Sequence, residues 1–202
     1  MFVKICGLST EEHVRVAVDA GADAIGFVFA DSVRRVDPAE AERISSNVPG
    51  TVKRVAVMLH PTNGQWQAVL DKFKPDVLQT DVEDFAELDV PDDIDCWRVY
   101  REGNRVTDTS RTSFMVSGTF LYEGARSGQG ETVDWSAAAQ LAKNGNMILA
   151  GGLGPDNVAA AIAAAKPYGV DVSSGVESAP GEKDSQKIRE FISAAKAAGN
   201  NL

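Results

Sequence analysis

The sequence predicts a single-domain (β/α)8 barrel that spans residues 1–202, and three observations support this prediction. Short apolar runs alternate with helical patterns eight times along the chain. The runs are apolar throughout, which is typical of parallel strands covered on both faces. Eight repeats of about 25 residues favour a closed barrel over an open doubly wound sheet, although the chain is near the lower size limit of such barrels.

Strands are predicted where aliphatic and aromatic residues cluster without a polar interruption. The first run ends at Cys6, and the fourth is the shortest. In chain order, the predicted strands are Phe2–Cys6, Ala24–Phe29, Val52–Leu59, Val77–Gln79, Ile94–Tyr100, Thr119–Tyr122, Asn146–Ala150 and Gly169–Val172.

Helices are predicted where apolar residues recur at helical spacing after a capping residue or a proline. Ser9 or Thr10 caps the first helix and Gly21 ends it, whereas Pro38 opens the second. Asp156 lies near the positive end of an alanine-rich helix. In chain order, the predicted helices are Thr10–Ala20, Pro38–Ser46, Asn63–Phe73, a brief one at Phe85–Leu88, one from Asp134, Pro155–Ala165 and Asp184–Ala198.

One repeat departs from this pattern. Residues Glu102–Thr112 are polar, lack an apolar stripe and include Gly103 and several threonines. Such a composition does not favour a helix. We therefore expect a loop or a single turn where the fifth helix should be, and a second loop around Gly128 and Gly130.

Composition and charge narrow the classes of function. A net charge of −9 argues against nucleic acid or an anionic membrane as the main partner, but not against a small anionic ligand. The two cysteines, Cys6 and Cys96, form no disulfide framework and fit a cytoplasmic location. No apolar run approaches the roughly 18 residues of a membrane span, and the N-terminus does not look like a signal peptide. No spacing of Cys, His, Asp or Glu resembles a metal site.

Two glycine-containing turns near the C-terminus are the most informative feature of the chain. Ala150-Gly-Gly-Leu153 and Val170-Asp-Val-Ser-Ser-Gly-Val-Glu177 each join a short apolar run to a predicted helix. Backbone amides at a helix start bind anions, and glycine lets a phosphate approach closely. The loops after strands seven and eight of (β/α)8 barrels often do this. The turns therefore predict a sugar-phosphate site at Gly151, Gly152, Ser173, Ser174 and Gly175.

Cys6 and Glu123 lie at the C-terminal ends of predicted strands, where barrels carry their catalytic residues. Cys6 is either a small buried core residue or a reactive thiol whose pKa is lowered by helix dipoles and a phosphate loop. Glu123 is either a solvated loop carboxylate or a general acid that faces Cys6 across the barrel mouth. An acid and a base on opposite sides of a sugar can move a proton between carbon and oxygen.

Asp171 and an arginine pair are further candidates. Asp171 lies within an apolar run, where a carboxylate needs a partner, so it is either a structural acceptor or a substrate ligand. Arg34 and Arg35 follow the second strand, and they are either solvated or include one clamp for a substrate carboxylate. His13 and His60 have no companion ligands, and we interpret both as surface residues.

The chain resembles the phosphoribosylanthranilate isomerases of tryptophan biosynthesis nearly from end to end. The stretch from about Pro75 to Ser117 is only weakly similar. The motifs that carry the resemblance are Val3-Lys-Ile-Cys-Gly7, Gly21-Ala-Asp-Ala-Ile-Gly-Phe-Val-Phe29 with Ser32-Val-Arg34, Gly128-Gln-Gly-Glu-Thr-Val-Asp-Trp135, Ala150-Gly-Gly-Leu-Gly-Pro-Asp-Asn157 and Val170-Asp-Val-Ser-Ser-Gly-Val-Glu177.

The resemblance implies a barrel without cofactor or metal, a monomer or a homodimer, that catalyses an Amadori rearrangement. The substrate, N-(5'-phosphoribosyl)anthranilate, becomes 1-(2-carboxyphenylamino)-1-deoxyribulose 5-phosphate. The family's general base is the cysteine of the Lys-Ile-Cys-Gly motif, here Cys6, and its general acid is an aspartate at the position of Glu123. The arginine that contacts the anthranilate carboxylate corresponds to Arg34, and the two glycine-containing turns hold the phosphate.

Two departures from the family keep an alternative open. Glu123 is one methylene longer than the family's aspartate, and a shift of ~1 Å can lower the rate by ~10²-fold. Asp81, in Gln79-Thr-Asp-Val82, replaces the histidine of the family's Gln-Leu-His-Gly segment. The alternative is a weakly active or non-catalytic phosphosugar-binding barrel of the same family. The histidine-pathway Amadori enzyme is disfavoured, because that family pairs two aspartates and the first strand here offers Cys6.

Overall fold

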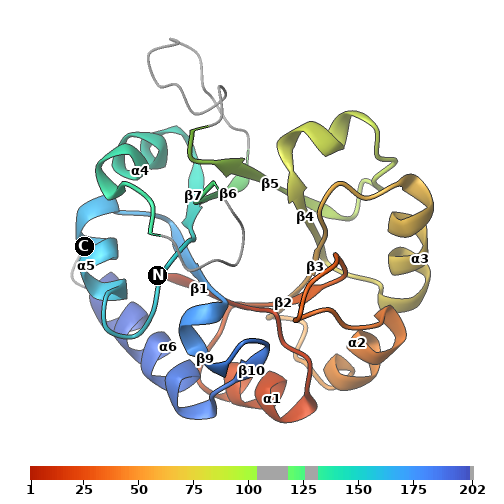
Figure 1. The fold of residues 1–202 in the computed structure, drawn as a ribbon, viewed down its shortest axis with the longest axis horizontal. Helices are drawn as coiled ribbons and strands as arrows, with labels where there is room; N and C mark the ends of the chain where they lie inside the picture. The colour runs from red at the N-terminus through yellow and green to blue at the C-terminus, as the bar shows by residue number, and fades with distance from the viewer. Residues whose placement is uncertain (104–117, 126–131, 201–202) are drawn as a thin grey trace.

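The computed structural model describes residues 1–103, 118–125 and 132–200, and in them the chain forms a closed barrel of eight parallel strands. Each strand pairs with the next one in the chain, and the eighth pairs with the first. The predicted fold class is confirmed (Figure 1). The barrel strands are β1 (Phe2–Cys6), β2 (Ala24–Val28), β3 (Lys53–Val57), β4 (Val77–Asp81), β5 (Asp95–Arg101), β6 (Thr119–Glu123), β7 (Asn146–Leu149) and β8 (Gly169–Val172).

Helices surround this barrel, and Figure 1 shows them as an outer ring. Several begin where the sequence predicts: Thr10 accepts a hydrogen bond from the amide of His13, Asp184 accepts from those of Gln186 and Lys187, and Pro38 is the first residue of its helix. The alanine-rich helix predicted from Pro155 begins three residues later, at Val158, because residues 155–157 form a turn. The helices are α1 (Glu11–Asp19), α2 (Pro38–Ser45), α3 (Asn63–Phe73), α4 (Trp135–Leu141), α5 (Val158–Ala165) and α6 (Ser185–Gly199).

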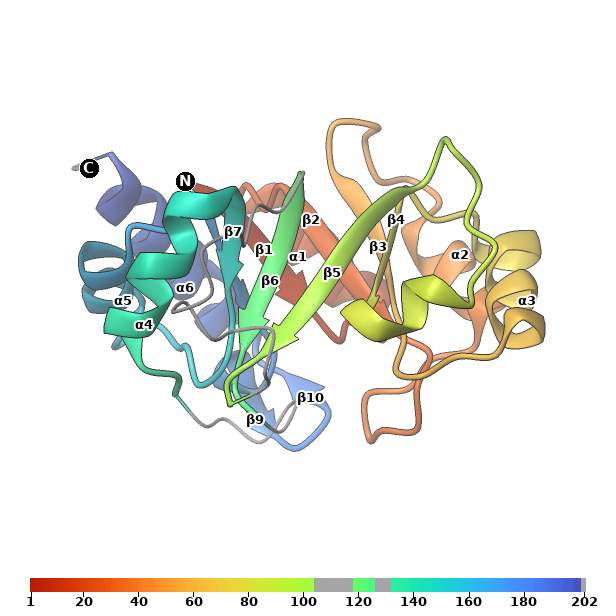
Figure 2. The same cartoon turned by 90° about the horizontal axis from the view of Figure 1, so that it is seen from above.

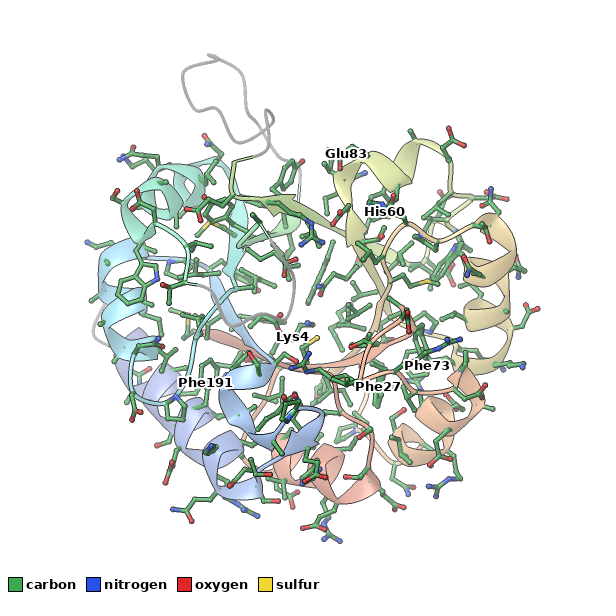
Figure 3. All side chains as sticks on the ribbon, viewed as in Figure 1. Lys4, Phe27, His60, Phe73, Glu83 and Phe191 are labelled. Carbon is green, nitrogen blue, oxygen red and sulfur yellow. The ribbon has the colours of Figure 1, made fainter. Side chains whose placement is uncertain are left out.

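Side chains alternate along each strand between the helices and the barrel interior. Val3 and Ile5 belong to the large core that the strands form with the helices, so the residue between them, Lys4, points into the barrel. Figure 3 shows Lys4 near the centre of the molecule. A smaller apolar cluster lies inside the barrel, and its buried members are Ala24, Val55, Val77, Trp97, Val99, Leu121 and Ile148.

The fourth and fifth repeats differ from the others in their helical parts. A 3-10 helix, η1 (Val82–Ala86), follows β4 in place of an α-helix, three residues earlier than the brief helix expected at Phe85–Leu88. The prediction for Glu102–Thr112 falls mostly on residues 104–117, and the loop around Gly128 and Gly130 on residues 126–131. Both lie outside the described residues.

The structure also contains a hairpin that the sequence did not predict. After β8, a short 3-10 helix, η4 (Ser174–Val176), leads to the antiparallel strands β9 (Glu177–Ala179) and β10 (Glu182–Lys183). Figure 2 shows this hairpin at the end of the barrel to which the arrowheads of β5 and β6 point. It therefore adds residues to the C-terminal face, where barrel enzymes carry their sites.

Three strands extend further than predicted. β4 continues to Asp81, β5 to Arg101 and β6 to Glu123. Each of these residues lies two positions after an interior residue of its strand, so its side chain also points inward. The three side chains therefore lie at the mouth of the barrel instead of in solvated loops. Their opposite charges let them pair there, which stabilises the strand ends.

Candidate active site

Cys6, the last residue of β1, is buried at the mouth of the barrel and is 6% exposed. Its neighbour across the sheet is Gly26 of β2. Burial raises the pKa of the Cys6 thiol above its ordinary value, although the positive charges of Lys4 and Lys183 oppose this effect. The pKa is therefore raised, not lowered as the sequence led us to expect, because burial disfavours the thiolate more strongly than the neighbouring cations favour it.

Beneath Cys6 lies an ion pair that is closed off from solvent. The Lys4 ammonium, 0% exposed, donates to Asp171 Oδ1 of β8 at 2.9 Å. Burial lowers the pKa of Lys4, but the charges of Asp171 and Cys6 outweigh it, so the pKa lies above the ordinary value and the lysine is charged. Asp171 thus has the partner that a carboxylate in an apolar run needs, and its predicted role as a substrate ligand stays a prediction.

The two glycine-containing turns lie against each other. Gly151 and Gly152 adopt positive φ values of 89° and 61°, which glycine tolerates and other residues rarely adopt. A Cβ added to Gly175 would lie 1.9 Å from the carbonyl oxygen of Leu153, so only glycine fits where the turns meet. Asn157 ties the first turn together, because its side chain accepts from the Gly154 amide and donates to the Gly152 carbonyl.

Arg34 lies in the loop after β2 and is held by Glu177 of the hairpin. Its Nε and Nη2 donate to the two carboxylate oxygens at 2.7 and 2.9 Å. The bidentate contact that the sequence suggested for a substrate is therefore made within the protein. Lys183 also donates to Glu177, at 2.7 Å, and to the Ser173 carbonyl, at 2.9 Å. Burial would raise the pKa of Glu177, but the hydrogen bonds from Arg34 and Lys183 lower it to about 2.

Gly7 brings this group of charges close to the end of β1. It has a φ of 73°, and an added Cβ would lie 2.8 Å from Arg34 Cδ and 3.0 Å from Ser173 Oγ. No side chain fits there without displacing one of these residues. The glycine after Cys6 thus lets Arg34 and Ser173 of the second glycine-containing turn lie close to the end of β1.

A second set of charges occupies the ends of β4, β5 and β6. Arg101 donates through Nε and Nη2 to the two oxygens of Asp81, at 3.1 and 2.7 Å, and through Nη1 to Glu123 Oε1. Asp81 is buried, whereas the side chain of Glu123 is 14% exposed at the mouth. Arg101 therefore fixes the position of Glu123.

His60 extends this second set toward β3. It adopts a positive φ, its Nδ1 lies 2.9 Å from Asp84 Oδ1, and its Nε2 lies 3.7 Å from Asp81 Oδ2. The hydrogen bond with Asp84 is the largest of the effects that raise the pKa of His60. Figure 3 shows His60 at the rim, and its side chain is 66% exposed, which agrees with its interpretation as a surface residue.

The sequence thus identified the residues at the strand ends but missed the charges that hold them. Lys4, Arg101, Glu177 and Lys183 were not selected. Lys4 carried a usable signal, because it stands two residues before Cys6 and therefore on the same face of the strand. Arg101 carried none, because its partners Asp81 and Glu123 lie 20 and 22 positions away in the chain. Lys183 lies only six positions after Glu177, but it is the unpredicted hairpin that brings the two together.

Within the described ranges, no group of three His, Cys, Asp or Glu side chains could hold a metal ion. No helix among those residues is both long and apolar enough to cross a membrane. What the site offers is a buried thiol, a carboxylate on a nearby wall, and backbone amides beside a cluster of cations. Such a set suits proton transfer on a phosphorylated ligand.

Comparison with known proteins gives consistent results. The model of the N-(5'phosphoribosyl)anthranilate (PRA) isomerase family matches residues 3–194. The N-(5'-phosphoribosyl)anthranilate isomerase of Geotalea uraniireducens is 42% identical over 205 residues, which cover 96% of this chain and 98% of that protein.

Two solved structures match the fold over the same extent. A phosphoribosylanthranilate isomerase in complex with reduced 1-(o-carboxyphenylamino)-1-deoxyribulose 5-phosphate is 31% identical with a TM-score of 0.78. Monomers of the dimeric enzyme from Thermotoga maritima are 32% identical with a TM-score of 0.79. Both alignments cover 98% of this chain and 99% of the other.

Proposed function

The chain belongs to the N-(5'-phosphoribosyl)anthranilate isomerase family and has that activity in tryptophan biosynthesis, and we propose that Cys6 and Glu123 perform its proton transfers. The observation that carries this proposal is their common position. Both side chains end interior-facing rows of the same barrel, at the end where the two glycine-containing turns lie. A sugar phosphate held by the turns can thus be reached from two walls.

Glu123 is the general acid of the first step. It gives its proton to the furanose ring oxygen of the substrate, the bond from that oxygen to C1 breaks, and the nitrogen lone pair forms a protonated Schiff base. Asp81 supports this step, because its two oxygens bind the same guanidinium that contacts Glu123. The Asp81 charge offsets the positive charge that Arg101 presents to the acid.

Cys6 is the general base of the second step. The Schiff base cation acidifies the proton on C2, and the thiolate removes it to give an enolamine. The enolamine then takes a proton on C1 and becomes the aminoketose product. A thiolate must form before this step, and burial raises the pKa of Cys6. The cations around Cys6 therefore have to support its ionisation.

Two anionic ends of the substrate fix the sugar between these groups. The 5'-phosphate binds the amides of the two turns, at Gly151, Gly152, Ser173, Ser174 and Gly175. The anthranilate carboxylate binds Arg34 through Nη1, since Nε and Nη2 are occupied by Glu177. Positioning of this kind can supply several kcal/mol of the barrier. Asp171 contributes by holding Lys4.

The partner is thus a small phosphorylated molecule, and the location is the cytoplasm. The relative of known structure with a bound product analogue supports the first statement. For the assembly, monomer and homodimer both stay open predictions. The Thermotoga maritima relative is dimeric, and light scattering on the purified chain separates the two states.

The test is turnover by the purified chain together with rescue of a tryptophan auxotroph that lacks the isomerase. We expect rescue by the parent chain and none by Cys6→Ser, whose kcat falls by about 10³-fold at similar KM because the base is lost. A soluble, well-expressed parent chain that failed to rescue would favour the alternative, a weakly active phosphosugar-binding barrel. Near-parental kcat in Cys6→Ser would show that another group is the base.

A further inference from the structure

Lys4 is the most unusual side chain in the barrel that the proton transfers do not use directly. Its ammonium is 0% exposed, although lysine is rarely buried completely. A buried charge destabilises the fold unless it is paired, and removing one partner of such a pair is strongly destabilising. The only ion pair of Lys4 in the described part of the chain is with Asp171. An apolar residue of similar size could fill this position without a buried charge, so packing alone does not explain why a lysine is present.

The position of Lys4 relative to Cys6 suggests that role. Both side chains point inward from β1, two residues apart. Cys6 pairs with Gly26 on β2, and the end of the Lys4 side chain also lies against Gly26. A Cβ added to Gly26 would lie 3.2 Å from Lys4 Nζ and 3.2 Å from Cys6 Sγ. Gly26 is not one of the glycines with a positive φ, so its backbone conformation does not require glycine. The ammonium and the sulfur share the space that a side chain would otherwise occupy.

The charges around Cys6 leave room for one more negative charge. They come from four segments: Lys4 on β1, Asp171 on β8, Lys183 on β10 and Arg34 after β2. Glu177 binds both Arg34 and Lys183. Three cations thus face two carboxylates, which leaves a single positive charge that one thiolate would neutralise.

We propose that Lys4 is a positioning residue that stabilises the Cys6 thiolate, with Asp171 orienting its ammonium and Gly26 leaving the space for the contact. This inference rests on the proposed role of Cys6 as the base. It assigns a chemical function to Lys4, the first residue of the Lys-Ile-Cys-Gly motif, and a steric one to Gly26. The alternative is that the Lys4–Asp171 pair only holds β1 to β8.

The test is the pH dependence of Cys6 alkylation by iodoacetamide, without substrate, in a full-length Cys96→Ser background. Cys96 is partly exposed and would otherwise add a second signal. Lys4→Met removes the ammonium at similar length, and we expect the alkylation midpoint to rise by about one pH unit or more. Asp171→Asn removes the nearby negative charge, and we expect the midpoint to fall. Gly26→Ala should raise the midpoint, because its methyl group separates the ammonium from the sulfur.

Lys196→Met is the matched control. Lys196 also pairs with an aspartate, Asp23, at 2.6 Å, but it has no contact with Cys6. The alkylation midpoint of Lys196→Met should equal that of the parent. A midpoint for Lys4→Met equal to that of Lys196→Met, or shifts of the same sign in Lys4→Met and Asp171→Asn, would overturn the proposal. If Lys4→Met does not fold, Asp171→Asn and Gly26→Ala still give the opposite shifts that decide the question.

Turnover separates this proposal from the assignment of the base. Lys4→Met should lower kcat about tenfold near neutral pH with little change in KM, and kcat should recover as the pH rises. A merely structural loss would not recover with pH. If Cys6→Ser instead kept near-parental kcat, the base assignment would fail while the alkylation shifts remained, so the two failures are distinguishable.

Discussion

The two walls of the barrel mouth each place a cation beside a proposed proton-transfer residue, but in different ways. On the wall formed by β1 and β8, the reactive group Cys6 stands above a buried pair, Lys4 and Asp171. On the wall formed by β4, β5 and β6, Glu123 itself belongs to the ion pair, and Arg101 joins it to Asp81. In both cases a cation is shared between the reactive group and a second carboxylate.

The difference lies in where the cation is placed. The base wall keeps its cation fully buried, so its charge acts on the thiol with little screening. The acid wall keeps its cation at the accessible mouth and binds two of its nitrogens with Asp81. The proposed base needs help to lose a proton, and the buried Lys4 charge favours its thiolate. The proposed acid must keep its proton until the ring opens, and Asp81 offsets part of the Arg101 charge that would favour the Glu123 carboxylate.

The strongest test of the acid wall is Glu123 itself. Glu123→Gln keeps the size of the side chain but cannot donate the proton, so we expect kcat to fall by about 10³-fold. Glu123→Asp restores the family's residue but withdraws the carboxyl by ~1 Å from Arg101, and we expect a loss of roughly 10- to 100-fold. Steady-state kinetics on both variants decides this. An Asp variant as active as the parent would show that the Arg101 contact does not position the acid.

Arg34 tests how the substrate lies between the walls. Arg34→Ala removes a charge-assisted hydrogen bond, and we expect KM to rise about 10- to 100-fold with a smaller change in kcat. Arg35→Ala is the control, because Arg35 is exposed and its KM should stay within about twofold. A larger effect for Arg35 would assign the anthranilate carboxylate to the other member of the pair.

Asp81 tests whether the acid wall works as a unit. Asp81→Asn leaves Arg101 with its full positive charge beside Glu123, which favours the carboxylate over the acid. We expect kcat/KM to fall about tenfold and its decline at high pH to begin at a lower pH. The pH profile of kcat/KM measures both effects. An unchanged profile would limit Asp81 to a structural role.

Glu177 gives the smallest expected effect, and it concerns stability. Its pKa is lowered to about 2, so it stabilises the fold above the unfolded-state value of roughly 4.3, and this contribution is lost as the pH falls toward 2. Glu177→Gln should lower the free energy of unfolding at pH 7 by about 2 kcal/mol. Urea unfolding should show the difference shrinking below pH 4, whereas the exposed control Glu182→Gln should show no difference at either pH.

The base wall could be predicted from the sequence because its information is local. Cys6 and Gly7 are adjacent, and each glycine-containing turn is a continuous segment. The first needs glycine for its positive φ values, and the second needs Gly175 for its close approach to Leu153. The eight strands were equally readable, since a strand covered on both faces must be apolar throughout. These features depend on residues within a few positions of one another.

The acid wall could not be predicted in the same way. Arg101 pairs with residues 20 positions before it and 22 positions after it, so no local pattern marks it. The same holds for Arg34 and Glu177, which are 143 positions apart. A charged residue beside an apolar run signals that a partner exists, but only closure of the barrel determines which residue it is.

The most direct measurement is a crystal structure of this chain with the reduced product analogue bound. We predict the phosphate at the amides of Gly152 and Gly175, Cys6 Sγ within contact of C2, and a Glu123 carboxyl oxygen beside the oxygen released from the ring. An analogue bound with C2 away from Cys6, or with Glu123 still turned from the sugar toward Arg101 alone, would contradict this prediction.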